Sequence, residues 1–137
     1  MKKTIIAAKN DNLHLAEDFI REQLEAAGCP SKIQMQIQLA VEEIFVNIAS
    51  YAYAPGTGKA GISVDITDGI VRIIFEDSGA PFDPLAEKEP DVTLPAEKRR
   101  IGGLGIFLVR KLMDHVSYKY KDGKNILTIE KKVGASA

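Results

Sequence analysis

The chain has 137 residues, 45% of them apolar, which suits one domain with a sizeable core. Its 18 basic and 19 acidic side chains give a formal net charge of -1, so no electrostatic feature points to nucleic acid as a partner. A single cysteine excludes an internal disulfide, and no apolar stretch approaches the roughly 20 residues of a membrane span, so we expect a cytoplasmic protein without a membrane partner.

The first part of the chain predicts a strand followed by two helices. Residues 4–8 are typical of a strand, and Asn10-Asp11-Asn12 offers N-cap oxygens for a helix whose apolar spacing runs up to Gly28. Ser31 is the expected cap of a second helix, which continues to about Tyr51 and carries an isoleucine-rich face.

Alternating apolar and polar residues predict an antiparallel hairpin in the middle of the chain. The alternating runs are 62–67 and 71–76, and Asp68-Gly69 between them is a tight-turn sequence. Ile74 breaks the alternation, which suggests that both faces of the second strand are covered.

A long segment without periodicity separates this hairpin from the C-terminal elements. It runs from Asp77 to about Arg100 and contains four of the six prolines; so long a loop is typical of an active-site lid or of disorder. A third helix at about 104–115 and a hairpin of 117–121 with 125–132 follow. Because strands come in hairpins and helices in runs, residues 1–137 predict a single α+β domain, a two-layer sandwich.

The first candidate for chemistry is a pair of polar residues on the second helix. Glu43 and Asn47 are four residues apart and therefore share a helix face. A carboxylate and an amide there suit a base and a ligand for Mg²⁺, which prefers oxygen. For an isolated pair of this kind, a solvated helix edge is the more frequent explanation.

The second candidate is Asp77-Ser78-Gly79, at the end of a predicted strand. An aspartate there can accept a hydrogen bond from an amino group such as that of adenine, and the glycine lets a base approach the backbone. The alternative is an ordinary turn, because all three residue types favour turns.

The third candidate is Gly102-Gly103-Leu104-Gly105, just before the third helix. Each glycine inside a helix costs roughly 1 kcal/mol relative to alanine, so this cluster needs a reason. Glycines let backbone N–H groups close around a phosphate at a helix N-terminus, and the upstream Lys98-Arg99-Arg100 offers cations for its charge. The alternative is a flexible loop with a solvated charge run.

Taken in chain order, the three candidates resemble the motifs of the GHKL nucleotide-binding fold of gyrase, histidine kinases and related ATPases. Glu43 with Asn47 resembles the N box of that fold. Asp77-Ser78-Gly79 resembles its first glycine box, and Gly103-Leu104-Gly105 its second. The resemblance implies the Bergerat ATP-binding fold, with a mixed, mostly antiparallel sheet and three helices on one face.

Within that fold, residues 77–84 and 103–114 resemble the anti-sigma-factor serine kinases. The resemblance implies that Glu43 is the general base, that Asn47 binds Mg²⁺ and that Asp77 holds the adenine amino group. The residues it implies in binding ATP are Asn47, Asp77, Gly79, Arg100, Gly103, Leu104 and Gly105. Two departures stand out: Tyr51 replaces a frequent histidine, and Lys124-Asn125 replaces a Gly-Thr step, which puts adenine contacts from the last strand in doubt.

Three functions follow as hypotheses. In the first, the chain is an ATP-dependent serine kinase that phosphorylates an anti-sigma-antagonist (STAS-type) protein and sequesters a sigma factor. In the second, it is an ATP-binding regulatory module that sequesters a sigma factor or another regulator with little phosphotransfer. In the third, it is an α/β domain without nucleotide. Glu43 favours the kinase, because a pure binder needs no base there. Whether the chain forms a homodimer, as relatives often do, stays open.

Overall fold

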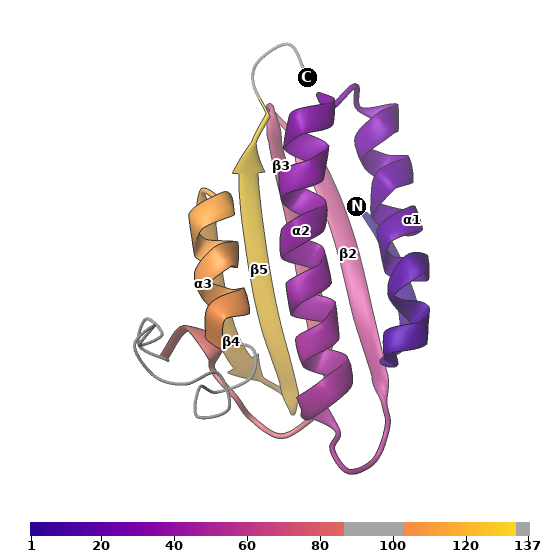
Figure 1. The fold of residues 1–137 in the computed structure, drawn as a ribbon, viewed down its shortest axis with the longest axis vertical. Coiled ribbons are helices and arrows are strands. Elements are labelled where there is room, and N and C mark those ends of the chain that lie inside the picture. The colour runs from indigo at the N-terminus through magenta and orange to yellow at the C-terminus, as the bar shows by residue number, and fades with distance from the viewer. Residues whose placement is uncertain (87–102, 134–137) are drawn as a thin grey trace.

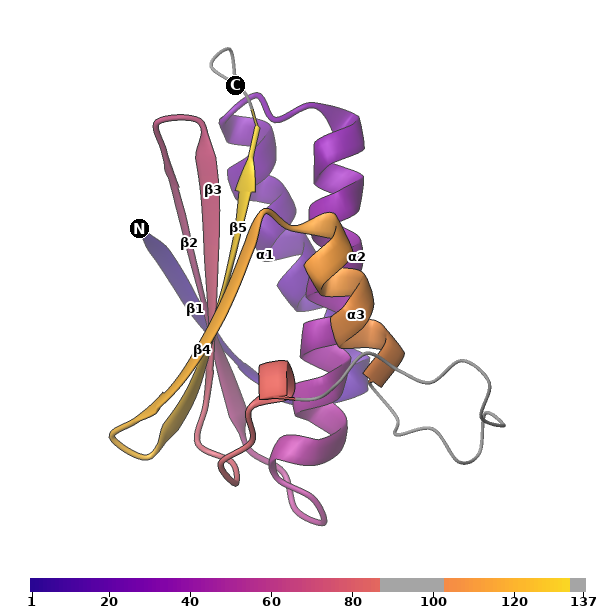
Figure 2. The same ribbon diagram turned by 90° about the vertical axis from the view of Figure 1, so that its left-hand side faces the viewer.

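The computed structural model describes residues 1–86 and 103–133, which form a five-stranded sheet with helices on one of its faces (Figures 1 and 2). The strands are β1 (Lys2–Ala7), β2 (Lys59–Thr67), β3 (Ile70–Asp77), β4 (His115–Lys121) and β5 (Lys124–Lys132). The helices are α1 (Leu13–Ala26), α2 (Ser31–Asn47) and α3 (Gly103–Leu112), with the short turns η1 (Asn10–Asn12), η2 (Ile48–Ala52) and η3 (Pro84–Ala86). The predicted two-layer α+β architecture is confirmed.

The sheet has the strand order β1-β2-β3-β5-β4. Every pairing between its described strands is antiparallel, so the parallel component implied by a mixed sheet is not found there. Two Asp-Gly turns join β2 to β3 and β4 to β5. Both residues of Asp68-Gly69 and of Asp122-Gly123 have positive φ, as a tight two-residue hairpin requires. The turn at Asp68-Gly69 and the two hairpins were predicted from the sequence alone.

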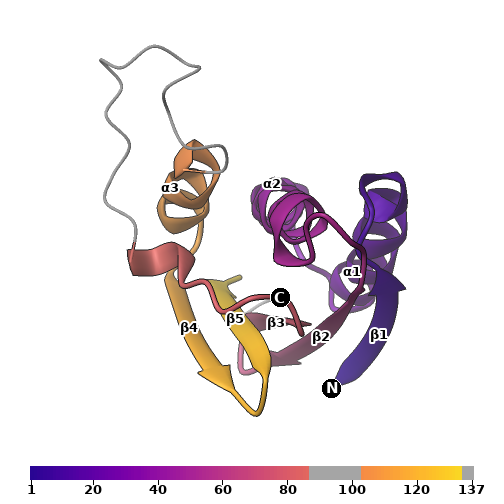
Figure 3. The same ribbon diagram turned by 90° about the horizontal axis from the view of Figure 1, so that it is seen from below.

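The core lies between the sheet and α2, which runs along the middle strands and packs against α1 on one side and α3 on the other (Figures 1 and 3). Its largest fully buried side chains come from all three helices and from the sheet: Ile20, Leu24, Ile37, Val41, Phe45, Ile62, Val71, Ile73, Phe75, Val109 and Ile129. Burial of each such side chain stabilises the fold by about 1.5–3 kcal/mol. None of the helices within residues 1–86 and 103–133 is long and apolar enough to cross a membrane.

Three local expectations were wrong. Ile74 is half-buried and alternates with the fully buried Ile73 and Phe75, which face the helices, so the second strand is fully covered on one face only. Asn12 does not cap α1, because its amide nitrogen donates to the carbonyl of Ala7 at 3.0 Å. Ser31 is the first residue of α2 and makes no capping hydrogen bond with its side chain.

Several elements end at the same edge of the molecule. Helix α2 finishes there and continues into η2, a turn of π-helix, while β3 arrives at this edge and β5 leaves from it (Figure 1). The first turn of α3 lies at the same end (Figure 2). The polar residues predicted at the ends of these elements are therefore brought into one region.

Candidate active site

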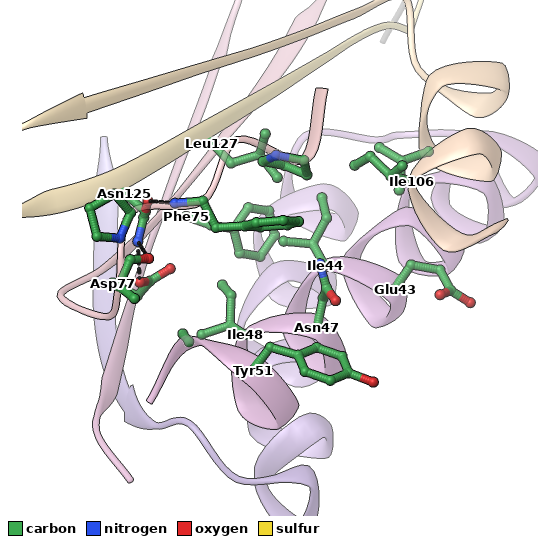
Figure 4. A pocket seen from close by; sticks show the side chains of 16 residues that line it. Glu43, Ile44, Asn47, Ile48, Tyr51, Phe75, Asp77, Ile106, Asn125 and Leu127 are labelled. Atoms are coloured by element: carbon green, nitrogen blue, oxygen red, sulfur yellow. Dashed lines mark hydrogen bonds between the residues drawn. The ribbon is translucent and has the colours of Figure 1, made fainter. Parts of the chain in front are cut away.

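A pocket of about 420 Å³ opens at this edge, between α2 with η2 on one side and β3, β5 and α3 on the other (Figure 4). Most of its wall is apolar: Ile44, Ile48, Tyr51, Ala52, Phe75, Ala80, Pro81, Phe82, Pro84, Ile106, Val109 and Leu127. Its polar lining residues are Glu43, Asn47, Asp77 and Asn125. An apolar cavity with a few convergent polar groups is the usual composition of a site for a small organic ligand.

The structure brings together three of the residues predicted from the sequence. Glu43, Asn47 and Asp77 all line the pocket, and Gly79 follows Asp77 by two residues. Gly103-Leu104-Gly105 forms the first turn of α3, immediately before the pocket residue Ile106. Arg100, together with Lys98, Arg99 and the remainder of the predicted lid over 87–102, lies outside the described residues.

Helix α2 supplies the first polar pair. Glu43 and Asn47 are one turn apart and half-buried, and Figure 4 shows both side chains among those that line the pocket. Neither makes a hydrogen bond or an ion pair with any other described residue. The carboxylate and the amide of this pair are therefore available, within the described part of the chain, to a ligand or a metal ion.

Strand β3 supplies Asp77, whose side chain is 8% exposed. Its Oδ1 atom accepts hydrogen bonds from the backbone N–H of Gly79 at 3.0 Å and from Nδ2 of Asn125 at 2.9 Å. Its Oδ2 atom has no partner among the described residues. This oxygen is reached from the pocket, so a ligand that covers it must donate a hydrogen bond to it or leave a desolvated acceptor without a partner.

The segment after β3 is packed tightly onto η2. A Cβ atom at Gly79 would lie 2.1 Å from the carbonyl oxygen of Ala52, and the N–H of Ala80 donates to that same oxygen at 3.1 Å. Tyr53 adds a second connection, because its hydroxyl accepts from the N–H of Ser78 at 2.8 Å and donates to the carbonyl of Lys59. Gly79 is thus needed for the approach of two backbone segments.

Replacement of Gly79 by alanine should lower the free energy of unfolding by about 1–3 kcal/mol, because the added methyl group forces these backbones apart. Equilibrium denaturant unfolding measures the change. The matched control is Ser78→Ala, whose exposed hydroxyl makes no hydrogen bond with the described residues and whose loss should matter by less than about 0.5 kcal/mol. Equal unfolding midpoints for Gly79→Ala and the parent would contradict the packing argument.

The pocket contains one polar residue that sequence reasoning did not place there. Asn125 begins the buried face of β5, in alternation with Leu127 and Ile129. This alternation is the sequence signal that could have placed Asn125 in the site, since it puts residue 125 on the face of the strand that points to the helices. Asn125 pairs with Asp77 of a strand that is distant in sequence, and no local sequence motif predicts this pairing.

Tyr118 of β4 lies behind this corner of the pocket and donates its hydroxyl hydrogen to Oδ1 of Asn125. Burial raises the pKa of Tyr118 above the ordinary tyrosine value of 10.0. A hydrogen bond with the backbone of Phe82 lowers this pKa, whereas the charges of Asp83 and Asp77 raise it further. The hydroxyl therefore keeps its proton, and with it the contact to Asn125, at neutral pH.

An alkaline titration should show the raised pKa of Tyr118. The folded chain holds the Tyr118 proton more tightly than the unfolded chain does, so the stability it contributes is complete below about pH 10 and is lost as the pH rises through the higher folded pKa. Subtracting the tyrosinate absorbance curve of Tyr118→Phe from that of the parent isolates this group. Its midpoint should lie above pH 10.0, and a midpoint at or below that value would contradict the burial argument.

Comparison with known proteins identifies the family of this chain. Residues 6–131 match the family profile described as the histidine kinase-like ATPase domain. The serine-protein kinase RsbW of Listeria monocytogenes is 31% identical over 127 residues, which cover 89% of this chain and 81% of that protein. The serine-protein kinase RsbW of Halalkalibacterium halodurans is 36% identical over 91 residues, or 64% of this chain and 56% of that protein.

A solved structure gives the same fold. The histidine kinase AdeS of Acinetobacter baumannii aligns with a TM-score of 0.54 at 15% sequence identity, over 98% of this chain and 70% of that one. At this identity the likeness concerns the arrangement of helices and strands alone.

Proposed function

Because this chain belongs to the histidine kinase-like ATPase family, and within it to the RsbW-type serine-protein kinases, we propose that it transfers the γ-phosphoryl group of ATP to a serine of a protein partner. The observation that supports the proposal most directly is the meeting of Glu43, Asn47 and Asp77 at one apolar pocket. These residues come from separate elements, α2 and β3, and no structural role requires all three to face one cavity.

The pocket has the chemistry that an adenine ring needs. Phe75, Ile48 and Leu127 offer apolar surface to the faces of a flat ring, and the unpartnered Oδ2 of Asp77 offers an acceptor to its amino group. The acceptor is the stronger of the two arguments, because a ring that covers this oxygen loses affinity unless it donates a hydrogen bond to it.

The phosphate end of the nucleotide would lie toward α2 and the start of α3. The side-chain oxygen of Asn47 would hold Mg²⁺, and the backbone N–H groups of Gly103-Leu104-Gly105 would face the phosphates, where the N-terminus of a helix favours negative charge. Arg100 is proposed, on the sequence resemblance, as the cation for the terminal phosphate. When bound, ATP supplies the phosphoryl group and Mg²⁺ the positive charge that stabilises its transfer.

Glu43 is proposed as the general base. It accepts the proton of the attacking serine hydroxyl, and it stands one helical turn from Asn47, so the base and the metal ligand are held by the same rigid element. Tyr51 occupies the position where the resemblance predicts histidine, and it brings an uncharged hydroxyl to this side of the pocket (Figure 4).

We propose in addition that the partner is an anti-sigma-antagonist of the STAS type and that the chain also binds a sigma factor. The support is the resemblance of residues 77–84 and 103–114 to the anti-sigma-factor kinases, together with similarity to proteins named serine-protein kinase. A pull-down from the native cell with ATP and Mg²⁺, followed by phosphosite mapping, tests this. A captured protein with a new phosphoserine supports the kinase, whereas capture without phosphorylation favours the ATP-binding regulatory module.

A further inference from the structure

Asn125 occupies a special position in the sheet. It is 7% exposed, it is the second residue of β5, and it pairs directly with Asp77 of β3 in the antiparallel register. Residues opposite each other in antiparallel strands project to the same face, with Cβ atoms about 4.5–5.5 Å apart. Here that face is the wall of the pocket, so backbone pairing itself brings the two side chains together.

All the hydrogen-bonding positions of the Asn125 amide are used within the protein. Its Nδ2 donates to Oδ1 of Asp77 at 2.9 Å and to the carbonyl of Ala80 at 3.0 Å. Its Oδ1 accepts from the N–H of Phe82 at 3.1 Å and from the hydroxyl of Tyr118. A backbone N–H can only donate and a carbonyl can only accept, so the amide has a single orientation. The amide therefore has no hydrogen-bonding position left for a bound molecule, and Asn125 influences its recognition through Asp77.

The Asp77 carboxylate is therefore held in one rotational orientation. Oδ1 is fixed by Asn125 and by the N–H of Gly79, and Oδ2 is the oxygen left for the pocket. Figure 4 shows it pointing away from Asn125. A ring with an amino group at this point gains a hydrogen bond. A ring with a carbonyl there places two acceptors against each other, which a buried site rejects strongly.

We propose that Asn125 is a positioning residue that fixes the Asp77 carboxylate, supported by Tyr118, and thereby sets the preference of the pocket for a 6-aminopurine over a 6-oxopurine. The inference rests on the proposed function, because it assumes that a purine nucleotide occupies the pocket. Without Asn125, the Asp77 carboxylate can turn, and water can enter between it and a ring carbonyl. The preference for the 6-aminopurine over the 6-oxopurine should then fall by a larger factor than the overall affinity for purine nucleotides.

The experiment compares ATP with ITP, which differ at this position of the ring, by calorimetry with Mg²⁺. The parent should bind ATP more tightly. In Asn125→Ala, the ratio of the ITP and ATP dissociation constants should fall by roughly tenfold or more, the worth of one hydrogen bond to a charged group. Tyr118→Phe removes one of the hydrogen bonds of the Asn125 side chain and should lower the ratio less. The control is Tyr120→Phe, whose side chain is 46% exposed and outside the pocket lining, and whose ratio should equal that of the parent.

The outcomes separate this inference from the function on which it rests. A parent that binds neither nucleotide overturns both. A parent that prefers ATP, combined with an Asn125→Ala variant that loses affinity for ATP and ITP by the same factor, overturns the inference alone and leaves a structural role for Asn125. If Asn125→Ala does not fold, as judged by circular dichroism, Tyr118→Phe decides: a reduced ratio supports the proposal, and an unchanged ratio overturns it.

Discussion

Replacement of Glu43 by glutamine is expected to lower the rate of phosphoryl transfer to the protein partner by roughly 10²–10⁴-fold, the usual worth of a general base. ATP binding should persist, because the proposed contacts with adenine and phosphate lie on Asp77 and on the first turn of α3. Glutamine keeps the size of the side chain and removes its proton acceptor. Radiolabelled transfer from ATP to the captured partner measures the rate, and calorimetry measures the binding.

The helix offers two comparisons for this experiment. Glu42→Gln makes the same chemical change at the neighbouring residue, which is exposed and does not line the pocket, and its transfer rate should match that of the parent. Asn47→Ala should lose Mg²⁺-dependent affinity as well as turnover, because it removes the proposed metal ligand. If Glu43→Gln transfers phosphate as fast as the parent, Glu43 is not the base.

Replacement of Asp77 by asparagine is expected to weaken ATP binding by roughly 10–100-fold, which corresponds to one hydrogen bond to a charged group. The Oδ1 position of Asp77 accepts from two N–H groups, so the amide oxygen of the variant should take that position. Its NH₂ group then faces the pocket and meets the amino group of adenine as donor against donor. Calorimetric titration with ATP and Mg²⁺ measures the loss.

The matched control for this variant is Asp65→Asn, on the face of the sheet away from the helices. Asp65 contacts the hydroxyl of Thr67 and lies outside the pocket lining, so its replacement should leave the affinity for ATP unchanged. If Asp77→Asn binds ATP as tightly as the parent does, Asp77 does not contact the nucleotide, and the proposed orientation of the nucleotide is wrong.

Those parts of the fold and the site that depend on neighbours in sequence could be predicted. Asp68-Gly69 formed the expected hairpin turn because positive φ at both residues is a local property. Glu43 and Asn47 were expected on one side of α2 because helical spacing fixes their separation. The family motifs were recognised for the same reason, since each is a short contiguous stretch.

The parts that depend on distant contacts could not be predicted. Asn10-Asp11-Asn12 was expected to offer an N-cap oxygen to α1, but Asn12, which stands at the cap position, donates its side-chain amide to the carbonyl of Ala7 at the end of β1. Asn125 seemed a departure from the family pattern in the sequence, and its role became visible only once β5 was paired with β3, placing it against a residue 48 positions earlier. Propensity is a weak guide where such a tertiary partner competes.

The position of α2 has a consequence for how the protein loses activity. This helix carries Glu43 and Asn47 on its pocket side, and its core-facing residues, among them Ile37, Val41 and Phe45, are buried. Elements packed in this way open only in the largest unfolding events, whereas frayed ends and surface loops open locally at little cost. The proposed base and metal ligand therefore belong to the last part of the chain to open. Heat should then abolish catalysis together with global unfolding, with no earlier inactive state in which α2 has melted alone.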